Sequence, residues 1–326
     1  SYLYNRNEYV EINNVQSNLQ PVTFGVPQGS ILGPLLFLLY INDIYSIIAD
    51  YVNNDLLLYA DDLCVVVSDT NSNQVSANLQ NILDILKSYC EKNHLFVNTS
   101  KTKIMFINSD NPNVVFNYNN NPIDIVDEFK YLGFIIDKRL KFKSQIQHIR
   151  KKLSMSNLAL CRASKFLDQN SLTLLCYSFS HSHLIYNKYV LSTLSKNQKS
   201  KLHRIFKHSG EIIYGPSFQN QKWKFNFDFQ TCYYLYLLFF KIINNISFRE
   251  LKSFIQSSTH TYNTRGCAML HQHSPNKICD KMLSVHFVKL WWKLPNEIQT
   301  CNNFNKFKKK LDYFLCNDDT LDGILY

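Results

Sequence analysis

Two adjacent carboxylates, Asp61 and Asp62, lie between runs of β-favouring aliphatic residues in the segment LLLYADDLCVVV at 56–67. The pattern predicts a strand, a tight turn and a returning strand. Ionised side by side, the carboxylates repel each other, and a turn between buried strands hydrates them less freely than an open loop would. Two divalent cations held there could activate a 3′-hydroxyl and stabilise a leaving pyrophosphate in an in-line phosphoryl transfer. An ordinary turn pair is the alternative for the dipeptide alone.

Composition and charge indicate a globular protein with a polyanionic partner. The chain has 326 residues, of which 45% are hydrophobic, which suits one large core or two to three modest domains. The net charge is +10, but residues 138–210 carry fifteen Lys and Arg against one acid, Asp168, so the remainder is mildly acidic. This basic block predicts contact with a polyanion, and a solvated basic face is the alternative.

Cysteine usage and apolar patterning bear on the compartment. The nine cysteines form no CxxC pair, and their number is odd, which suits a reducing compartment. Pro34, Asn42 and Asp43 interrupt the longest apolar stretch, at 31–48, which favours a buried core helix over a membrane span. The sequence begins with Ser1 and not with methionine, which suggests a fragment. Its start lacks the features of a signal peptide, so we expect a protein that is not secreted and that lies in the nucleus or cytoplasm. We expect no membrane partner.

The residues before the acidic hairpin predict a hairpin, a loop and a helix. Alternation at 9–12 is typical of one strand of a short hairpin. The loop at 24–30 contains two glycines and a proline, and we expect it to lead into a buried helix that starts near Ile31 and has Pro34 in its first turn. Glycine lets backbone approach a ligand closely, although a structural turn explains this loop equally well.

The residues after the acidic hairpin predict a helix on a sheet. Apolar side chains recur at helical spacing over 72–94 and predict an amphipathic helix. We expect short strands at 95–98 and 103–107 around a polar turn that contains Lys101. Further predictions are a loop over 108–121 and a hairpin over 129–137. Strand, helix and strand around an acidic hairpin form a palm-like α+β arrangement.

A long basic helix is predicted after residue 138. Apolar residues recur at steps of four and three, with Ser156 at the missing place; they are Phe142, Ile146, Ile149, Leu153, Leu160, Ala163 and Leu167. Arg150, Lys151 and Lys152 lie off this apolar stripe. The pattern predicts a helical bundle that grips nucleic-acid phosphates.

The C-terminal region gives weaker signals. Aromatic-rich segments at 223–229 and 233–243 are interpreted as core, and a last helix is predicted around 304–314, with lysines at four positions. A zinc site could be formed by four possible ligands, Cys267, His271, His273 and Cys279, but their spacing matches no common ligand pattern.

Together, and in this order, the motifs resemble those of the reverse transcriptases of jockey-like non-LTR retrotransposons. Residues 25–37 with Ile41-Asn42-Asp43 look like motif B, and Tyr59-Ala60-Asp61-Asp62 looks like motif C. Residues 98–103 look like motif D, and Tyr131-Leu132-Gly133 looks like motif E, the primer grip. The start at 1–6 and the tail segments 262–265, 290–291 and 294–295 are also similar to this group, although Trp292 stands where the group usually has Asn.

The resemblance implies a fold and a reaction. The expected class is α+β, with a partial right-hand polymerase palm at 1–137 in which helices pack on an antiparallel sheet, a basic helical thumb at 138–210, and a mostly helical C-terminal region at 211–326. The implied reaction is RNA-templated DNA synthesis from a 3′-hydroxyl DNA primer, with deoxynucleoside triphosphates and two Mg²⁺ ions.

The resemblance also implies residue roles. Asp61 and Asp62 are the implied catalytic metal ligands, and Lys101 is placed near the leaving pyrophosphate, where an ammonium can neutralise charge or donate a proton. A solvated turn lysine is the alternative for Lys101. The other implied contacts are Pro27, Gln28, Gly29, Tyr59 and Ala60 with template and substrate, Tyr131, Leu132 and Gly133 with the primer, and Lys143, Arg150, Lys151 and Lys152 with nucleic acid.

One expected catalytic group is missing. The family has a further metal-bridging aspartate, motif A, upstream of motif B, whereas residues 1–27 contain only Glu8 and Glu11 as acids. We therefore hypothesise that the chain is the C-terminal part of a polymerase and is inactive alone. The rival interpretation is a catalytically dead nucleic-acid-binding remnant, and a third is a viral or intron-encoded polymerase of another group. Templated extension that depends on Asp61 separates the first two.

Overall fold

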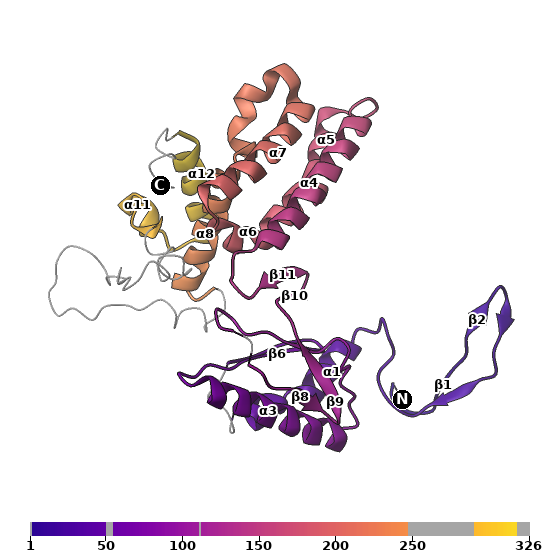
Figure 1. Ribbon diagram of the computed structural model, residues 1–326. Helices are drawn as coiled ribbons and strands as arrows, with labels where there is room; N and C mark the ends of the chain where they lie inside the picture. The colour runs from indigo at the N-terminus through magenta and orange to yellow at the C-terminus, as the bar shows by residue number, and fades with distance from the viewer. Residues whose placement is uncertain (1, 50–54, 111, 247–289, 318–326) are drawn as a thin grey trace. The chain divides into compact units, whose positions relative to one another are not determined.

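The computed structural model describes residues 2–49, 55–110, 112–246 and 290–317, and it divides into two compact units (Figure 1). The first unit comprises Ser1–Phe129 and Asp137–Leu140, and the second comprises Lys130–Ile136 and Lys141–Tyr326. The prediction of a mixed α and β protein is confirmed, with small, mostly antiparallel sheets. The division into palm, thumb and tail remains a prediction.

The first unit begins with an extended antiparallel hairpin. Strand β1 (Arg6–Glu8) pairs with β4 (Gln20–Val22), and β2 (Glu11–Ile12) pairs with β3 (Val15–Gln16). At the tip, Asn13 and Asn14 have φ angles of 52° and 63°, values that asparagine tolerates better than most residues. The predicted hairpin is therefore present.

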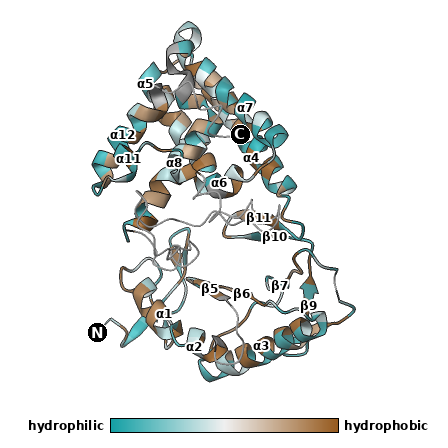
Figure 2. Cartoon of the chain, turned by 90° about the vertical axis from the view of Figure 1, so that its left-hand side faces the viewer, coloured by the Kyte–Doolittle hydropathy of each residue, from teal (hydrophilic) through white to brown (hydrophobic). Residues whose placement is uncertain are grey.

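Helix α1 (Gly33–Ile41) has its Pro in the first turn, as predicted, but it is not a buried core helix. Its buried residues are Gly33 and Ile41, whereas Leu35, Leu38 and Leu39 are exposed. Figure 2 shows the largely hydrophobic colour of this helix. The expectation of burial is wrong because, within the described residues, only one end of α1 and the following helix α2 (Ile44–Ala49) enter a core.

A second helix supports the acidic hairpin. Helix α3 (Ser72–Lys92) is capped by the preceding residue, Asn71, whose side chain accepts a hydrogen bond from the Asn73 amide. Ile82 and Tyr89 are buried in one core with Leu56, and the other predicted apolar positions are partly buried against the same core or the neighbouring one. The predicted amphipathic helix is confirmed.

Two strand predictions in the first unit need correction. Residues 95–98 form no strand; Phe96 is 97% exposed, and the segment has no ladder partner. Part of the predicted loop at 108–121 is strand β8 (Phe116–Tyr118), which pairs with β9 (Asn121–Ile125) through the turn residues Asn119 and Asn120. Phe116 and Tyr118 are buried with Ile123, so a core contact overrides the polar composition. Strand β7 (Lys103–Ile104) pairs in parallel with β9.

The hairpin of β10 (Glu128–Tyr131) and β11 (Phe134–Asp137) lies where it was predicted.

Helices make up most of the second unit (Figure 1). The helices are α4 (Lys143–Ala163), α5 (Gln169–Cys176), the π-helix η1 (Tyr177–His181), α6 (Ser182–Ser192), α7 (Lys196–Tyr214), the 3₁₀ helix η2 (Gly215–Phe225), α8 (Phe227–Ile243), α11 (Asn296–Gln299) and α12 (Phe304–Asn317). None of the described helices is both long and apolar enough to cross a membrane.

The apolar stripe of α4 faces a core, as predicted. Ile146, Ile149, Leu153 and Leu160 are buried against α5, α6 and α7. Ser156, at the missing place in the stripe, is also buried, and its hydroxyl lies 2.6 Å from that of Ser180. Leu167 was predicted on this stripe, but it lies beyond the end of the helix and is 42% exposed.

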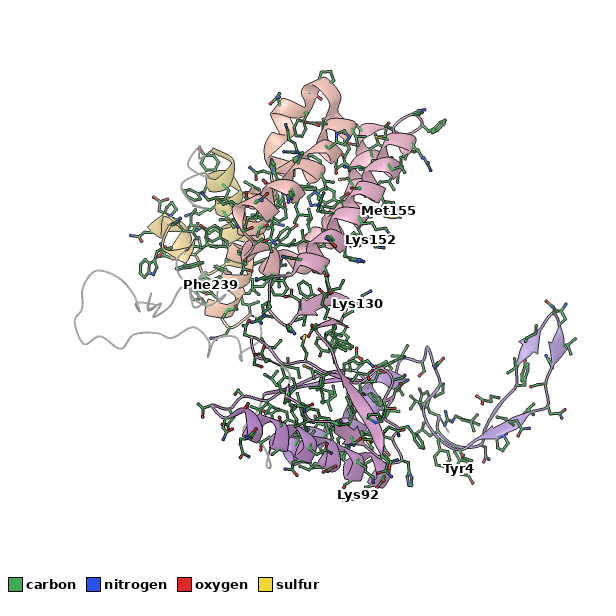
Figure 3. All side chains as sticks on the ribbon, viewed as in Figure 1. Tyr4, Lys92, Lys130, Lys152, Met155 and Phe239 are labelled. Atoms are coloured by element: carbon green, nitrogen blue, oxygen red, sulfur yellow. The ribbon has the colours of Figure 1, made fainter. Side chains whose placement is uncertain are left out.

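The C-terminal helices share a second core. Phe307 and Leu311 of α12 are fully buried against α8, and Phe239 of α8 (labelled in Figure 3) lies edge to face with Trp291, with ring centroids 5.1 Å apart. The aromatic residues of α8 therefore form core, as predicted. The candidate zinc ligands and the tail segment 262–265 lie outside the described residues.

Gly210, near the C-terminal end of α7, is required by close packing. A Cβ atom at this position would lie 2.4 Å from Cε2 of Phe218 and 2.6 Å from Cγ of Phe225. Gly210→Ala is expected to lower the free energy of unfolding by about 2 kcal/mol, because overpacking outweighs the better helix propensity of alanine. Urea unfolding measures the change, and Ser200→Ala, at an exposed position of α7, is the control. If both variants have the same free energy of unfolding, the claim that a side chain at position 210 would clash with Phe218 and Phe225 is contradicted.

His181 makes the helical unit sensitive to acid. Its ring is buried next to the rings of Tyr177 and Phe206, and burial lowers the pKa of His181 to about 4. Because the unfolded chain binds this proton more readily, the free energy of unfolding is expected to fall by up to about 3 kcal/mol as the pH drops from 6.5 toward 4.

His181→Leu is expected to remove this part of the pH dependence, and urea unfolding at pH 7 and pH 5 measures it. His148→Leu, which replaces a partly exposed histidine of α4, should keep the dependence. An unchanged pH profile in His181→Leu would show that another group titrates.

Candidate functional site

The acidic turn is formed by strands β5 (Asp55–Tyr59) and β6 (Asp62–Val66). Tyr59 pairs with Asp62, which leaves a two-residue loop of Ala60 and Asp61. Ala60 has a φ angle of 52°, in the left-handed region that two-residue hairpin loops require. The predicted strand, turn and strand are therefore present, and the turn exposes Asp61 at its tip.

The two faces of this hairpin differ. Leu56, Leu58 and Leu63 face the core shared with α2 and α3. On the opposite face, Leu57 is 54% exposed and Tyr59 is 66% exposed, and both Asp61 and Asp62 are exposed to water. The expectation that buried strands would keep water from the carboxylates is wrong, so mutual repulsion alone favours a cation there.

The chemistry of the turn fits a hard divalent cation in part. Carboxylate oxygens are the ligands that Mg²⁺ prefers, and Asp61 and Asp62 provide two such groups at adjacent positions. No lysine or arginine forms an ion pair with either residue within the described parts of the chain. Among the same residues, no group of three or more His, Cys, Asp or Glu side chains is close enough to hold a metal ion.

The loop at 24–30 is held in shape by residues from the start of the chain. The Arg6 guanidinium donates to the carbonyl oxygens of Phe24 (3.1 Å) and Gly25 (2.7 Å). The Ser30 hydroxyl donates to the Pro27 carbonyl at 2.6 Å and accepts from the Gly33 amide, which joins the loop to the start of α1. These roles of Arg6 and Ser30 were not predicted, because both contacts depend on the folded loop.

Within this loop, Gln28 and Gly29 are exposed and Pro27 is partly buried. Gly29 has a φ angle of 77°, which strongly favours glycine, and a Cβ built there would meet no atom within 4 Å. The backbone at Gly29 is therefore open to a ligand.

Lys101 lies in a tight turn after α3. The backbone amide of Lys101 donates to the main-chain oxygen of Asn98 at 3.1 Å and to its side-chain oxygen at 3.2 Å, so Asn98 shapes the turn. The Lys101 side chain is exposed and forms no ion pair with any described residue. Its ammonium group is thus available to an anionic ligand.

The structure brings some predicted residues together and leaves others apart. Tyr59, Ala60, Asp61 and Asp62 meet at one turn. Within the described residues, no hydrogen bond or ion pair joins this turn to residues 27–29 or to Lys101.

A partly buried hydrogen bond between α3 and the residue before α2 was not predicted. The Tyr89 hydroxyl donates to Oδ1 of Asp43 at 2.6 Å. Burial, reinforced by this hydrogen bond, raises the pKa of Tyr89. The helix predicted to follow the motif B loop is therefore anchored to the helix behind the acidic hairpin. The spacing of the two residues in the sequence gives no signal of this contact.

The predicted primer grip is the turn of hairpin β10–β11. Leu132 and Gly133 have φ angles of 46° and 81°, so both central residues are left-handed, as a type I′ turn requires. The Tyr186 hydroxyl of α6 donates to the Leu132 carbonyl, and its ring lies 3.9 Å from a Cβ built at Gly133. Tyr131 and Leu132 are partly buried.

The basic residues predicted on α4 lie on its outer surface. Lys143, Arg150, Lys151 and Lys152 are exposed, and none of them pairs with an acid within the described residues. Met155, which is 59% exposed, follows them along the same helix, and Figure 3 shows Lys152 and Met155 on α4. These four cations occupy exposed positions around one helix, and exposed lysine and arginine side chains are suited to contact with phosphates.

Comparisons with known proteins identify the first part of the chain. Residues 1–136 match the family described as reverse transcriptase (RNA-dependent DNA polymerase). The RNA-directed DNA polymerase from mobile element jockey of Drosophila melanogaster is 28% identical over 155 residues, which cover 46% of this chain and 17% of that protein. The probable RNA-directed DNA polymerase from transposon BS of Drosophila melanogaster is 33% identical over 150 residues, which cover 44% of this chain and 16% of that protein.

The jockey polymerase of Drosophila funebris is 29% identical over 181 residues, 52% of this chain and 20% of that protein. No solved structure matches the chain. The chain thus spans about a fifth or less of the length of these relatives. Residues 1–136 thus match the reverse transcriptase family, and about half of the chain is similar in sequence to the RNA-directed DNA polymerases of Drosophila mobile elements.

Proposed function

We propose that this chain provides part of the active site and the primer–template surface of an RNA-directed DNA polymerase of a non-LTR retrotransposon. The observation that carries the proposal is the hairpin β5–β6, which presents Asp61 and Asp62 together at an exposed turn within the region related to reverse transcriptases. The substrates are an RNA template, a DNA primer and deoxynucleoside triphosphates, and the nucleus or cytoplasm is the proposed compartment.

In this proposal, Asp61 and Asp62 hold divalent cations, with Mg²⁺ as the natural ion. When bound, a pair of such ions would supply the positive charge that activates a primer 3′-hydroxyl and stabilises a leaving pyrophosphate. The loop around Gln28 and Gly29 lies against template and substrate, where the open space beside Gly29 permits close approach of the backbone. Lys101 neutralises charge on the pyrophosphate, because its exposed ammonium has no acidic partner in the described residues.

The nucleic-acid contacts are proposed on the second unit. Lys143, Arg150, Lys151 and Lys152 contact phosphates of the primer–template duplex, and the turn at Tyr131, Leu132 and Gly133 contacts the primer near its 3′ end. Phosphate contacts of this kind give affinity without sequence preference.

A second candidate function is nucleic-acid binding without catalysis. The observation that favours it is the incomplete ligand set: within the described residues, Asp61 and Asp62 have no third acidic, cysteine or histidine neighbour that could help to hold a metal. Two carboxylates alone hold metal ions weakly and position them poorly.

Primer extension on an RNA template with Mg²⁺ tests whether this chain is active alone, and duplex binding tests the nucleic-acid surface that both candidates share. We compare this chain with Asp61→Ala/Asp62→Ala and measure duplex binding by fluorescence anisotropy in parallel. The expected result is that both proteins bind primer–template and neither extends it, because the chain presents two of the required carboxylates. Templated extension that the double substitution abolishes would show that the chain completes its own site. Absence of duplex binding would contradict the proposed function itself.

A further inference from the structure

A chain of buried amide groups connects hairpin β10–β11 to two helices of the second unit. The Ile135 amide donates to Oε1 of Gln145 at 2.9 Å, and Nε2 of Gln145 donates to Oδ1 of Asn187 at 2.9 Å. Asn187 in turn donates from Nδ2 to the His183 carbonyl at 2.7 Å. Strand β11, helix α4 and helix α6 are therefore joined by consecutive hydrogen bonds.

The burial and polarity of these groups fix one arrangement. Gln145 is 1% exposed and Asn187 is 6% exposed, so water does not compete for their hydrogen bonds. Turning the Gln145 amide around would set its NH₂ group against the Ile135 N–H, which is also a donor. Each amide side chain has both a donor and an acceptor engaged, and this leaves the hairpin a single low-energy position.

Two further contacts hold the hairpin. The Tyr186 hydroxyl donates to the Leu132 carbonyl at the turn, and the Phe134 ring lies edge to face with Phe142 at the start of α4, with centroids 5.5 Å apart. Hairpin residues 130–136 accordingly fall in the same compact unit as the helices. The hairpin is therefore held by side chains of α4 and α6 as well as by its own turn.

The geometry points to a specific role. Gln145 lies five residues before Arg150, about 8 Å along the axis of the same helix, so a hairpin fixed to Gln145 is also fixed relative to Arg150. We propose that Gln145 and Asn187 are positioning residues that lock hairpin β10–β11 to α4 and α6. The primer 3′ end is thereby held in fixed register with the phosphate contacts on α4. This inference rests on the proposed function, in which the turn at 131–133 is the primer grip.

The test uses the whole chain and a double variant. In Gln145→Met/Asn187→Leu, two apolar side chains of similar shape replace both partners of the Gln145–Asn187 hydrogen bond, and the Ile135 amide loses its acceptor, which releases the hairpin from α4. Gln147→Met, at an exposed position of the same helix, is the matched control. Thermal unfolding shows that each protein folds, and anisotropy gives the affinity for the duplex.

The decisive readout is a photo-crosslink from a 4-thiothymidine at the 3′ end of a DNA primer annealed to RNA, with crosslinked peptides identified by mass spectrometry. In the double variant, we expect the yield to residues 131–134 to fall about tenfold, as the loss of the hydrogen bond that holds Ile135 to Gln145 implies, while duplex affinity changes less than about twofold. A merely structural pair would lower folding stability and leave the crosslink of the folded protein in place.

An unchanged crosslink yield in the folded double variant would overturn the positioning role. Should that variant not fold, Asn187→Ser alone removes the amide that holds Nε2 of Gln145 and keeps Gln145 itself, and a crosslink yield equal to that of the wild type would overturn the role equally. If the wild-type chain binds duplex but never crosslinks through 131–134, the assignment of the primer grip fails, and the inference fails with it. The rate of hydrogen exchange at the Ile135 amide separates these cases, because it measures the hydrogen bond between Ile135 and Gln145 without any nucleic acid.

Discussion

Charge reversal of Arg150, Lys151 and Lys152 to Glu is expected to weaken binding of a primer–template duplex by at least about 100-fold at 0.1 M salt. The three side chains are exposed on α4 and are not neutralised by acids of the described chain, so each is available to a phosphate. Reversal removes three attractions and adds three repulsions on one helix. Fluorescence anisotropy over a range of salt concentrations measures both the affinity and its salt dependence.

The salt dependence of binding distinguishes direct contacts with phosphates from a general attraction by the positive net charge of the protein. Replacing the same three residues by Met is expected to lower the slope of log K against log salt by about 2 to 3, since each lost contact contributes about 0.9. The control is reversal of Lys306, Lys308 and Lys309, which are exposed on α12 and carry the same total charge. Equal loss of affinity in both triple reversals would show that net charge, not the α4 surface, determines binding.

Asp61→Asn/Asp62→Asn is expected to weaken Mn²⁺ binding at the hairpin turn by at least about tenfold, because asparagine keeps an oxygen ligand but removes the negative charge that attracts a hard cation. Mn²⁺ serves as a spectroscopic probe for Mg²⁺. Electron paramagnetic resonance of free Mn²⁺ measures the affinity, and the shape of the hairpin should persist because both carboxylates are exposed.

The matched control is Asp84→Asn/Glu91→Gln, which removes two exposed carboxylates from α3 in the same unit. It should leave the Mn²⁺ affinity of the turn unchanged. If the control and the hairpin variant lose the ion equally, the metal is bound by diffuse negative charge, and Asp61 and Asp62 do not form a site.

Local chemistry made the turns and the amphipathic helices predictable. Residues 60–61 and 132–133 form two-residue loops because β-favouring residues flank them on both sides, and Ala60, Leu132 and Gly133 adopt positive φ there. Helix α3 follows from the spacing of its apolar residues and ends within two residues of the predicted position. The candidate site at Asp61 and Asp62 was found in the same way, from residue types at a turn.

Features that depend on distant contacts were not predictable. Helix α1 is as apolar as a core helix, but its burial depends on neighbours that the local pattern does not specify. Phe116 and Tyr118 form a strand in a polar segment because they reach a core with Ile123. The bonds from Tyr89 to Asp43 and from Gln145 to Asn187 join residues more than forty positions apart, and single amide or hydroxyl side chains carry no periodic signal.

The central claim is that Asp61 and Asp62 hold divalent metal beside the primer 3′ end. Fe²⁺ can replace Mg²⁺ at a carboxylate site and, with ascorbate and peroxide, generates hydroxyl radicals that cut nearby nucleic acid. With end-labelled primer annealed to an RNA template, we expect cuts confined to a few nucleotides around the primer 3′ end. Excess Mg²⁺ and Asp61→Asn/Asp62→Asn should each suppress these cuts, while the duplex stays bound. Cuts spread along the duplex, or cuts at the 3′ end that persist in the double variant, would contradict the claim.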